Sequence, residues 1–334
     1  MKLTISPKSA RFAALAAVAA RVFLGLMVEA PTTRNGAWLA AILGGLLAAP
    51  WVYCIGRCKP CRELLAIPLA LLTALDAASM FAALARSAGY LALDRSPAVV
   101  LLLPTGIALA WCVRRNGDAI GYGAMIWARL ATALLLIVVL LQWRYYRPLW
   151  LRPVLGEGWI SILEGGARTA GWITAAASVL VLPDGPDRRV SLIVPLGGTA
   201  VAAALIALQL MMTPANLNGG GWLNRLDTLL CNGRAPLYLQ LPMIVFWFAG
   251  LCHLLACELF ASAALAQRVF KRTDGRPIAL VVVGTAIALA GTDALPKLTA
   301  AIRPLSFPIA GLLTAVSMLF NARKGGRVDC ASEN

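Results

Sequence analysis

Apolar residues run along the chain in long continuous segments that short polar connections separate. A helix needs about 20 mostly apolar residues to cross a bilayer, and ten segments fit or approach that requirement. The predicted spans are residues 10–31, 37–55, 64–92, 98–113, 119–142, 169–183, 190–212, 236–267, 277–292 and 302–320. These segments are continuous and rich in Ala and Leu, whereas the strands of a membrane barrel alternate over about ten residues. The pattern predicts an all-α integral membrane protein with about ten transmembrane helices.

The composition agrees with a membrane protein, and the distribution of basic residues indicates how the chain is oriented in the membrane. Only 13% of the 334 residues are charged and 60% are hydrophobic, whereas a soluble domain carries about 25% charged residues. If both termini are cytoplasmic, 17 of the 30 basic residues fall in inner segments and 10 in outer ones. Such an excess inside is typical of membrane topology. The net charge of +15 therefore indicates orientation in a lipid membrane, and nucleic acid is not expected as a partner.

Ten spans divide into two halves of five within one polytopic membrane domain, residues 1–334. The first repeat is predicted at about 10–142, the outer loop at 143–168, the second repeat at about 169–320, and a short basic tail at 321–334. An odd number of spans per half inverts the second half relative to the first. Inverted repeats are common in secondary transporters, where the first helix of each half is often broken near the midplane. The sequence thus predicts a five-plus-five inverted repeat.

Glycine and proline interrupt the first span, because Gly25 weakens a helix and Pro31 removes a backbone donor. Gly171 stands in the first span of the second half. We therefore expect residues 25–29 to be unwound and to line a central cavity, with a matching break near Gly171. The simpler alternative is a continuous helix whose Glu29 reaches the outer interface.

Ionisable residues inside the spans form a candidate buried charge network. Arg21 and Arg129 lie about ten residues from predicted cytoplasmic ends, and Asp76 lies about twelve residues into its span. At about 1.5 Å per residue this places them near the middle of a core about 30 Å thick. A structural ion pair and a ligand or proton site explain these residues equally, and both place them inside the bundle. Glu258 of the eighth span completes the network.

Motifs for catalysis or metal binding are weak. Three of the eight cysteines, Cys54, Cys58 and Cys61, have a spacing used by some iron–sulfur enzymes. They are predicted on a short turn where no other feature supports an iron–sulfur cluster, so chance explains the spacing better. The single histidine, His253, has no partners at the spacing of a triad or zinc site. The sequence has no P-loop, GxGxxG, HExxH or GxSxG pattern. We expect no enzyme, no catalytic residue, no metal and no cofactor.

Seven short motifs occur in an order that resembles the B subunit of bacterial spore germinant receptors, a branch of the amino acid–polyamine–organocation superfamily. These motifs are ISP (5–7), NGAWLA (35–40), ARSAGYLALDRSP (85–97), IWARL (126–130), RPVLGEGWISILEGG (152–166), NRLDTL (224–229) and FWFAGL (246–251). The ordered set covers most of the chain.

The resemblance implies a leucine-transporter-like fold and a receptor for small amino acid-like nutrients in the inner spore membrane. It also implies companion A-type and C-type subunits. The ligand site would lie between helices 1 and 6, with helices 3 and 8 as walls. Carried across, it comprises Gly25, Leu26, Met27, Val28, Glu29, Asp76, Gly171 and Trp172. The family's helix-six glutamate is missing, because the corresponding stretch reads TAGW at 169–172.

Three functions follow as alternatives from these features. The leading hypothesis is a nutrient-sensing subunit that binds a small solute and signals by a conformational change. The second is an amino acid permease coupled to protons or sodium through Asp76 or Glu29. The third is a scaffold whose site is vestigial. Because permeases and transporter-like receptors share a fold, the fold alone does not decide between them.

Overall fold

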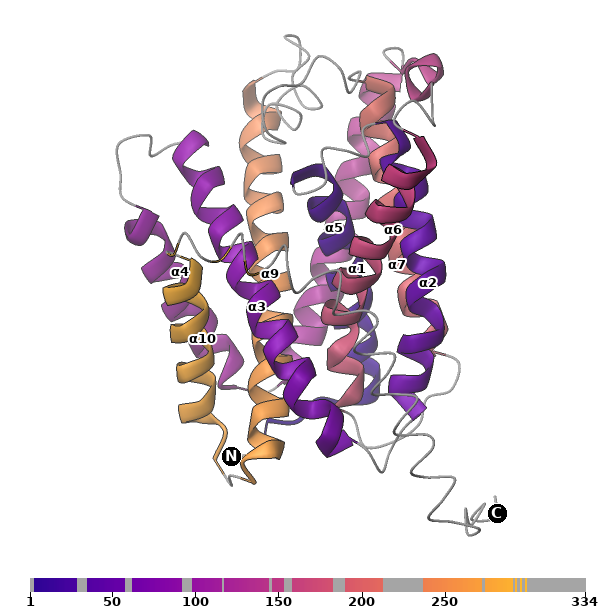
Figure 1. Ribbon diagram of the computed structural model, residues 1–334. Coiled ribbons are helices and arrows are strands. Elements are labelled where there is room, and N and C mark those ends of the chain that lie inside the picture. Colours follow the sequence, from indigo (N-terminus) through magenta and orange to yellow (C-terminus); the bar gives the residue numbers. More distant parts are fainter. Residues whose placement is uncertain are drawn as a thin grey trace, which may run out of the picture.

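The computed structural model is a bundle whose helices run roughly side by side (Figure 1). It describes residues 3–28, 35–57, 62–91, 98–115, 117–143, 146–152, 158–182, 190–212, 237–271 and 274–290, with the single residues 292, 295 and 298. Every regular element in this part of the chain is a helix. The prediction of an all-α protein is confirmed for the residues described.

Five helices of the first half coincide with the first five predicted segments to within a few residues. They are α1 (Pro7–Val28), α2 (Ala37–Arg57), α3 (Arg62–Leu91), α4 (Ala98–Val113) and α5 (Gly117–Gln142). Long apolar runs without strand-like alternation produce these helices, as the sequence indicated.

A short 3-10 helix, η3, is the first of the remaining elements. They are η3 (Pro148–Leu151), α6 (Gly158–Ala176), η4 (Ala177–Val181), α7 (Val190–Met212), α9 (Leu237–Val269) and α10 (Arg276–Ala290). The predicted tenth span at 302–320, the tail at 321–334 and the connection at 213–236 lie outside the described residues.

The start of the sixth helix was predicted too late. The sequence placed it at residue 169 with an outer loop before it, but α6 begins at Gly158. Its first turns are amphipathic, because Trp159 and Ile160 are exposed while Ile162 and Gly166 are buried. Glycines and one glutamate interrupt the apolar run, so a search for long apolar segments passes over this part of the helix.

Two helical segments in the described part are long and apolar enough to cross a membrane. They are Ala66–Leu84 in α3 and Phe248–Val269 in α9. Shorter apolar helices occur at Ala37–Tyr53, Leu102–Val113, Leu192–Leu208 and Arg276–Ala290. Helices α3 and α9 pack against each other, and most of both segments is buried inside the bundle.

The helices pack as two connected groups. On one side α2 contacts α6 and α7, and α1 contacts α5, α6 and α7; on the other, α3 contacts α9 and α10, and α4 contacts α9 and α10 (Figure 1). Contacts of α9 with α1 and α6 join the groups. Helix α1 therefore lies against both α6 and α9.

Pairs of glycines let helix backbones approach closely at two crossings. A Cβ on Gly44 of α2 would stand 2.4 Å from Cβ of Thr169 on α6, and one on Gly198 of α7 would stand 2.6 Å from Cγ1 of Val18 on α1. Both distances are too short for a real Cβ, so these crossings require glycine. Each pair follows a leucine, as Leu-Gly-Gly at 43–45 and at 196–198, and its first glycine is seven residues after its helix begins.

Hydrogen bonds tie the N-terminal segment to the end of the bundle where α5 begins and α9 ends. The backbone N–H of Leu3 donates to Oε1 of Gln267 at 2.9 Å, and that of Ser6 donates to Oδ1 of Asp118 at 2.8 Å. The N–H of Gly117 donates to the carbonyl of Thr4 at 3.2 Å. These bonds hold residues 3–6 against α5 and α9.

Connections at the opposite end are also bonded to each other. The side-chain amide of Asn35, just before α2, donates to the carbonyl of Arg152 at 3.2 Å. The backbone N–H of Arg147 donates to the carbonyl of Met211 at the end of α7 at 2.9 Å. The segment around η3 is therefore fixed to α2 and α7.

Asp274 lies just before α10, and its Oδ1 accepts the backbone N–H of Arg276 at 3.1 Å. That hydrogen bond lowers the pKa of the Asp274 carboxyl below its ordinary value. A lowered pKa in the folded state means that the contribution is present at neutral pH and is lost as the pH falls through the folded-state pKa. We expect hydrogen exchange at the first turn of α10 to quicken with acidification, and Asp274→Asn to weaken that pH dependence. An unchanged exchange profile in the variant would contradict this role.

Candidate functional site

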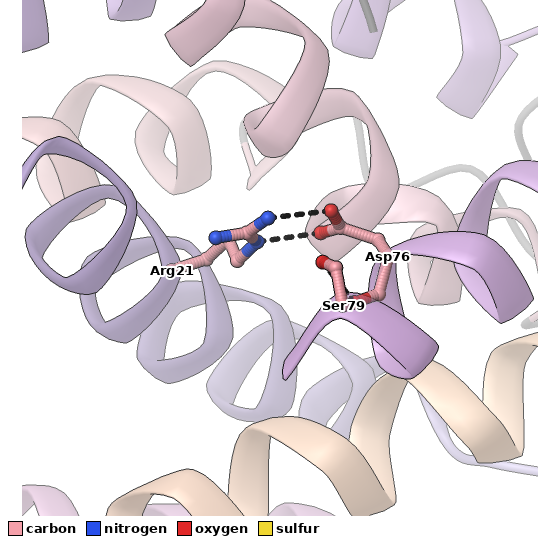
Figure 2. Close-up of polar contacts among 3 residues, drawn as sticks. All are labelled: Arg21, Asp76 and Ser79. Carbon is pink, nitrogen blue, oxygen red and sulfur yellow. Dashed lines mark hydrogen bonds and ion pairs between the residues drawn. The ribbon is translucent and has the colours of Figure 1, made fainter. Parts of the chain in front are cut away.

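A fully buried ion pair joins α1 to α3 at the centre of the bundle. Nε of Arg21 donates to Oδ2 of Asp76 and Nη2 donates to Oδ1, both at 2.6 Å (Figure 2). The side chains are 0% and 4% exposed. The two parallel bonds form a bidentate guanidinium–carboxylate pair, the strongest geometry for such groups. The prediction that Arg21 and Asp76 lie inside the bundle is confirmed.

Burial makes this pair sensitive to any change in either partner. Isolated charges cost several kcal/mol in a protein interior, and breaking a buried pair by removing one partner costs about 3–5 kcal/mol. Ser79, one turn further along α3, donates its hydroxyl to the backbone carbonyl of Asp76 at 2.8 Å (Figure 2). The Ser79 hydroxyl thus bonds to the backbone, and the carboxylate faces Arg21.

Trp172 of α6 covers the same guanidinium. The Cζ atom of Arg21 lies 4.9 Å from the centroid of the Trp172 ring, within cation–π range, and the indole is 1% exposed. A Cβ on Gly25 would stand 2.6 Å from Cε3 and Cζ3 of Trp172. Gly25, Trp172, Arg21 and Asp76 therefore form one contiguous cluster from α1, α3 and α6, which we call the central cluster.

The predicted break in the first helix is wrong for residues 25–28, because α1 is helical without interruption from Pro7 to Val28. Gly25 serves instead to make room for the Trp172 ring. Leu26, Met27 and Val28 belong to this helix, but their side chains, and all of Glu29, lie outside the described residues.

The predicted break at Gly171 is also wrong, since α6 continues through it to Ala176. Gly171 is buried in a helix whose last eight residues are all buried. The change in the backbone comes later, where η4 takes over at Ala177. The guanidinium of Arg268 donates to the carbonyls of Val181, at 3.1 Å, and Leu182. These bonds cap the C-terminal end of η4 and attach it to α9.

The two other members of the predicted charge network have different surroundings. Glu258 of α9 is 1% exposed, as expected for an interior group. Arg129 of α5 is exposed, so its predicted place inside the bundle is wrong. Helix α5 is apolar on all sides around Arg129, and such a sequence does not indicate which face is buried.

A small hollow between α1, α5 and α9 was not predicted. Its lining includes Ala13, Trp127, His253 and Cys257. The volume open to the centre of a water molecule is about 10 Å³. That volume is near the lower limit for one water molecule. The His253 ring lies directly over Gly123, where a Cβ would stand 2.7 Å from Cε1. Gly123 is the sequence feature that could have indicated this contact, because a glycine leaves space for a side chain on the facing helix.

The central cluster offers binding chemistry, since a guanidinium and a carboxylate match the two charges of a zwitterion. Among the residues that the structure describes, no group of three His, Cys, Asp or Glu side chains could hold a metal ion. No protein-family model and no curated protein matches the chain. The geometry of the central cluster is therefore the basis for the functional inference.

Proposed function

We propose that this chain is a multi-pass membrane protein of five-plus-five inverted-repeat design, with both termini on the cytoplasmic side of a bacterial membrane. It acts as the nutrient-sensing, transporter-like subunit of a spore germinant receptor, without covalent chemistry. A small zwitterion such as an amino acid binds between α1, α3, α6 and α9. The observation that carries the proposal is the buried Arg21–Asp76 pair beneath Trp172, where the first helices of both halves meet.

The pattern of helix contacts supports the inverted repeat. If α1 to α4 correspond to α6, α7, α9 and α10 in that order, the contact of α2 with α6 corresponds to that of α7 with α1. In the same way, the contact of α3 with α10 corresponds to that of α9 with α4. Both members of each pair of contacts are present, as a two-fold arrangement of the halves requires.

Individual residues support the same correspondence. Val18 of α1 packs on Gly198, the second glycine of the α7 pair, and Thr169 of α6 packs on Gly44, the first glycine of the α2 pair. The two contacts therefore match to within one residue. Arg21 follows Val18 by three residues, and Trp172 follows Thr169 by three. On this correspondence Arg21 and Trp172 occupy nearly equivalent places in the two halves, and they contact each other. Equivalent residues of a two-fold repeat meet only near its axis, so this contact supports an axis that passes close to the central cluster.

The bonded ends of the bundle support the proposed topology. Leu3 bonds to Gln267 and Ser6 to Asp118, and the sequence places all four near cytoplasmic ends. At the opposite end, the bonds of Asn35 with Arg152 and of Arg147 with Met211 join segments that the sequence places outside. None of these bonds links a predicted inner segment to a predicted outer one.

A zwitterion would act by competing within the ion pair. Its carboxylate would bind the guanidinium of Arg21 in place of Asp76. Its ammonium group would bind the carboxylate of Asp76 in place of Arg21, and Trp172 would contact its side chain. Because this exchange separates α1 from α3, the ligand binds best to a second packing of the halves and shifts the population toward it. The conformational change is the signal to the companion A-type and C-type subunits.

Glu258 favours a proton-coupled amino acid permease as the second candidate. A carboxyl group buried inside an apolar helix is a common element of proton relays in transporters. Uptake of a labelled amino acid by vesicles that contain this chain alone would favour the permease. Binding without uptake favours the receptor subunit.

The proposal predicts a ligand-dependent shift in thermal stability. A panel of amino acids is added to the purified protein in detergent, since a specific ligand stabilises the native state by mass action. At 100 times its Kd, one amino acid is expected to add about 2.7 kcal/mol to the free energy of unfolding. Trp172→Phe keeps an aromatic ring beside Arg21 and is expected to change the order of preference among side chains. A panel without any stabilising amino acid would contradict the proposed function.

A further inference from the structure

We propose that the outward face of α5 is a docking surface for a transmembrane helix of another protein, and that this helix carries a carboxylate opposite Arg129. The inference rests on the proposed function in one respect, the placement of α5 across a membrane. It names the chemistry by which a partner subunit would recognise this chain.

Arg129 lies near the middle of α5, where a charge that faces lipid costs the most free energy. It is the thirteenth of the 26 residues of α5, so about 18 Å of helix separates it from either end. An arginine side chain near a helix end can extend to the interface, but this one is in the middle. Its side chain is exposed, and no ion pair or hydrogen bond joins it to another residue of the described part. A partner must supply the opposite charge if α5 spans the membrane.

The surroundings of Arg129 suit helix packing. Its neighbours on the same face are exposed and recur at alternating spacings of four and three residues. The face comprises Tyr122, Ile126, Arg129, Ala133, Leu136 and Leu140. This spacing produces a seam along which a second helix can lie at a shallow angle, and the small Ala133 permits close approach beside the guanidinium. The opposite face of α5, with Ile120 and Ala124, is buried in the bundle.

Among the residues that the structure describes, no acidic side chain suits a second copy of this chain as the occupant. The acidic residues described deep inside helices are Asp76 and Glu258, and both are buried. Asp76 is already bonded to Arg21. Of the exposed acidic residues described, Glu164 is already paired with Arg168, and Asp274 lies just before the start of α10. The proposal therefore commits to a carboxylate on a different protein.

A peptide of defined sequence tests this chemistry. The full-length protein carries a donor fluorophore in phosphatidylcholine vesicles, and the probe is an acceptor-labelled Leu/Ala transmembrane peptide with one central Glu. Counterparts with Gln or Leu at that position serve as references. We expect the Glu peptide to associate about tenfold more tightly than the Leu peptide. Arg129→Leu should remove this preference, and Arg129→Lys should keep part of it.

Arg115→Leu is the matched control, because Arg115 is also an exposed arginine but lies at a helix end. This variant should leave the preference for the Glu peptide unchanged. Equal association of the three peptides with the wild-type protein would overturn the proposal. So would a preference that survives Arg129→Leu.

Thiol labelling tests the placement of α5 in the membrane independently of the docking surface. In a protein without native cysteines, Arg129→Cys should react with a membrane-impermeant thiol reagent far more slowly than Arg115→Cys. Equally fast labelling would place the face of α5 in water and overturn both this inference and the multi-pass arrangement. Slow labelling without a peptide preference would overturn the docking surface alone.

Discussion

Asp76→Asn is expected to lower the free energy of unfolding by about 3–5 kcal/mol, which is the largest effect that we predict for a single side chain. The substitution keeps the shape of the side chain but removes the charge that Asp76 holds against the fully buried guanidinium of Arg21. Chemical denaturation of the purified protein in detergent, followed by circular dichroism, measures the change. Arg21→Met combined with Asp76→Leu removes both charges and is expected to recover most of the loss.

The chain offers a matched control for this prediction in Glu164 and Arg168, an ion pair one turn apart on α6. The pair is exposed, with an N–O distance of 3.4 Å. Exposed pairs contribute about 0–1 kcal/mol because water screens them. Glu164→Gln should therefore have a small effect. Comparable losses for Asp76→Asn and Glu164→Gln would show that the Arg21–Asp76 pair is not buried as described.

Gly25→Leu is expected to produce the second largest loss, about 1–3 kcal/mol or more, through overpacking. Even the first atom of the new side chain would lie 2.6 Å from the Trp172 ring, and this ring is itself 1% exposed. Trp172→Ala in the same molecule should recover part of the loss, since it creates space next to residue 25. The double-mutant cycle gives the coupling energy directly.

Gly284 provides the control for the same substitution in a helix. It lies inside α10, and a Cβ there would meet no atom within 4 Å. Leucine favours a helix over glycine by nearly 1 kcal/mol, so Gly284→Leu should be neutral or stabilising. If Gly25→Leu were equally harmless, the close contact between α1 and Trp172 would be refuted.

The helices of this fold are largely visible in the sequence, whereas the shape of the candidate site is not. Long apolar runs fix where helices can form, and nine of the ten predicted segments overlap helices in the described part. Gly25 and Gly171 were interpreted as breaks because glycine weakens an isolated helix. In the packed bundle Gly25 permits the close contact with Trp172. Both helices continue through their glycines, so tertiary packing outweighs the intrinsic preference.

The members of the candidate site were partly predictable. The equal depths of Arg21 and Asp76 in their spans indicated that both lie inside, and they are bonded to each other. The contact of Arg21 with Trp172 depends on the register between helices 151 residues apart, and no local pattern encodes that register. Arg129 resembled Arg21 in depth and in apolar surroundings, so depth alone could not distinguish a buried arginine from an exposed one.

The distance along the chain between Arg21 and Asp76 has a consequence for how the protein is made. Arg21 leaves the ribosome 55 residues before its counter-charge, and a lone arginine in mid-membrane costs about 2.5–3.5 kcal/mol on insertion scales. On the proposed topology, α1 therefore gains little by entering lipid alone. It is expected to wait beside the translocation channel until α3 emerges, so that α1, α2 and α3 pass into the bilayer as one unit. Asp76→Asn would then reduce not only the stability of the finished protein but also the fraction of nascent chains whose first helix is inserted.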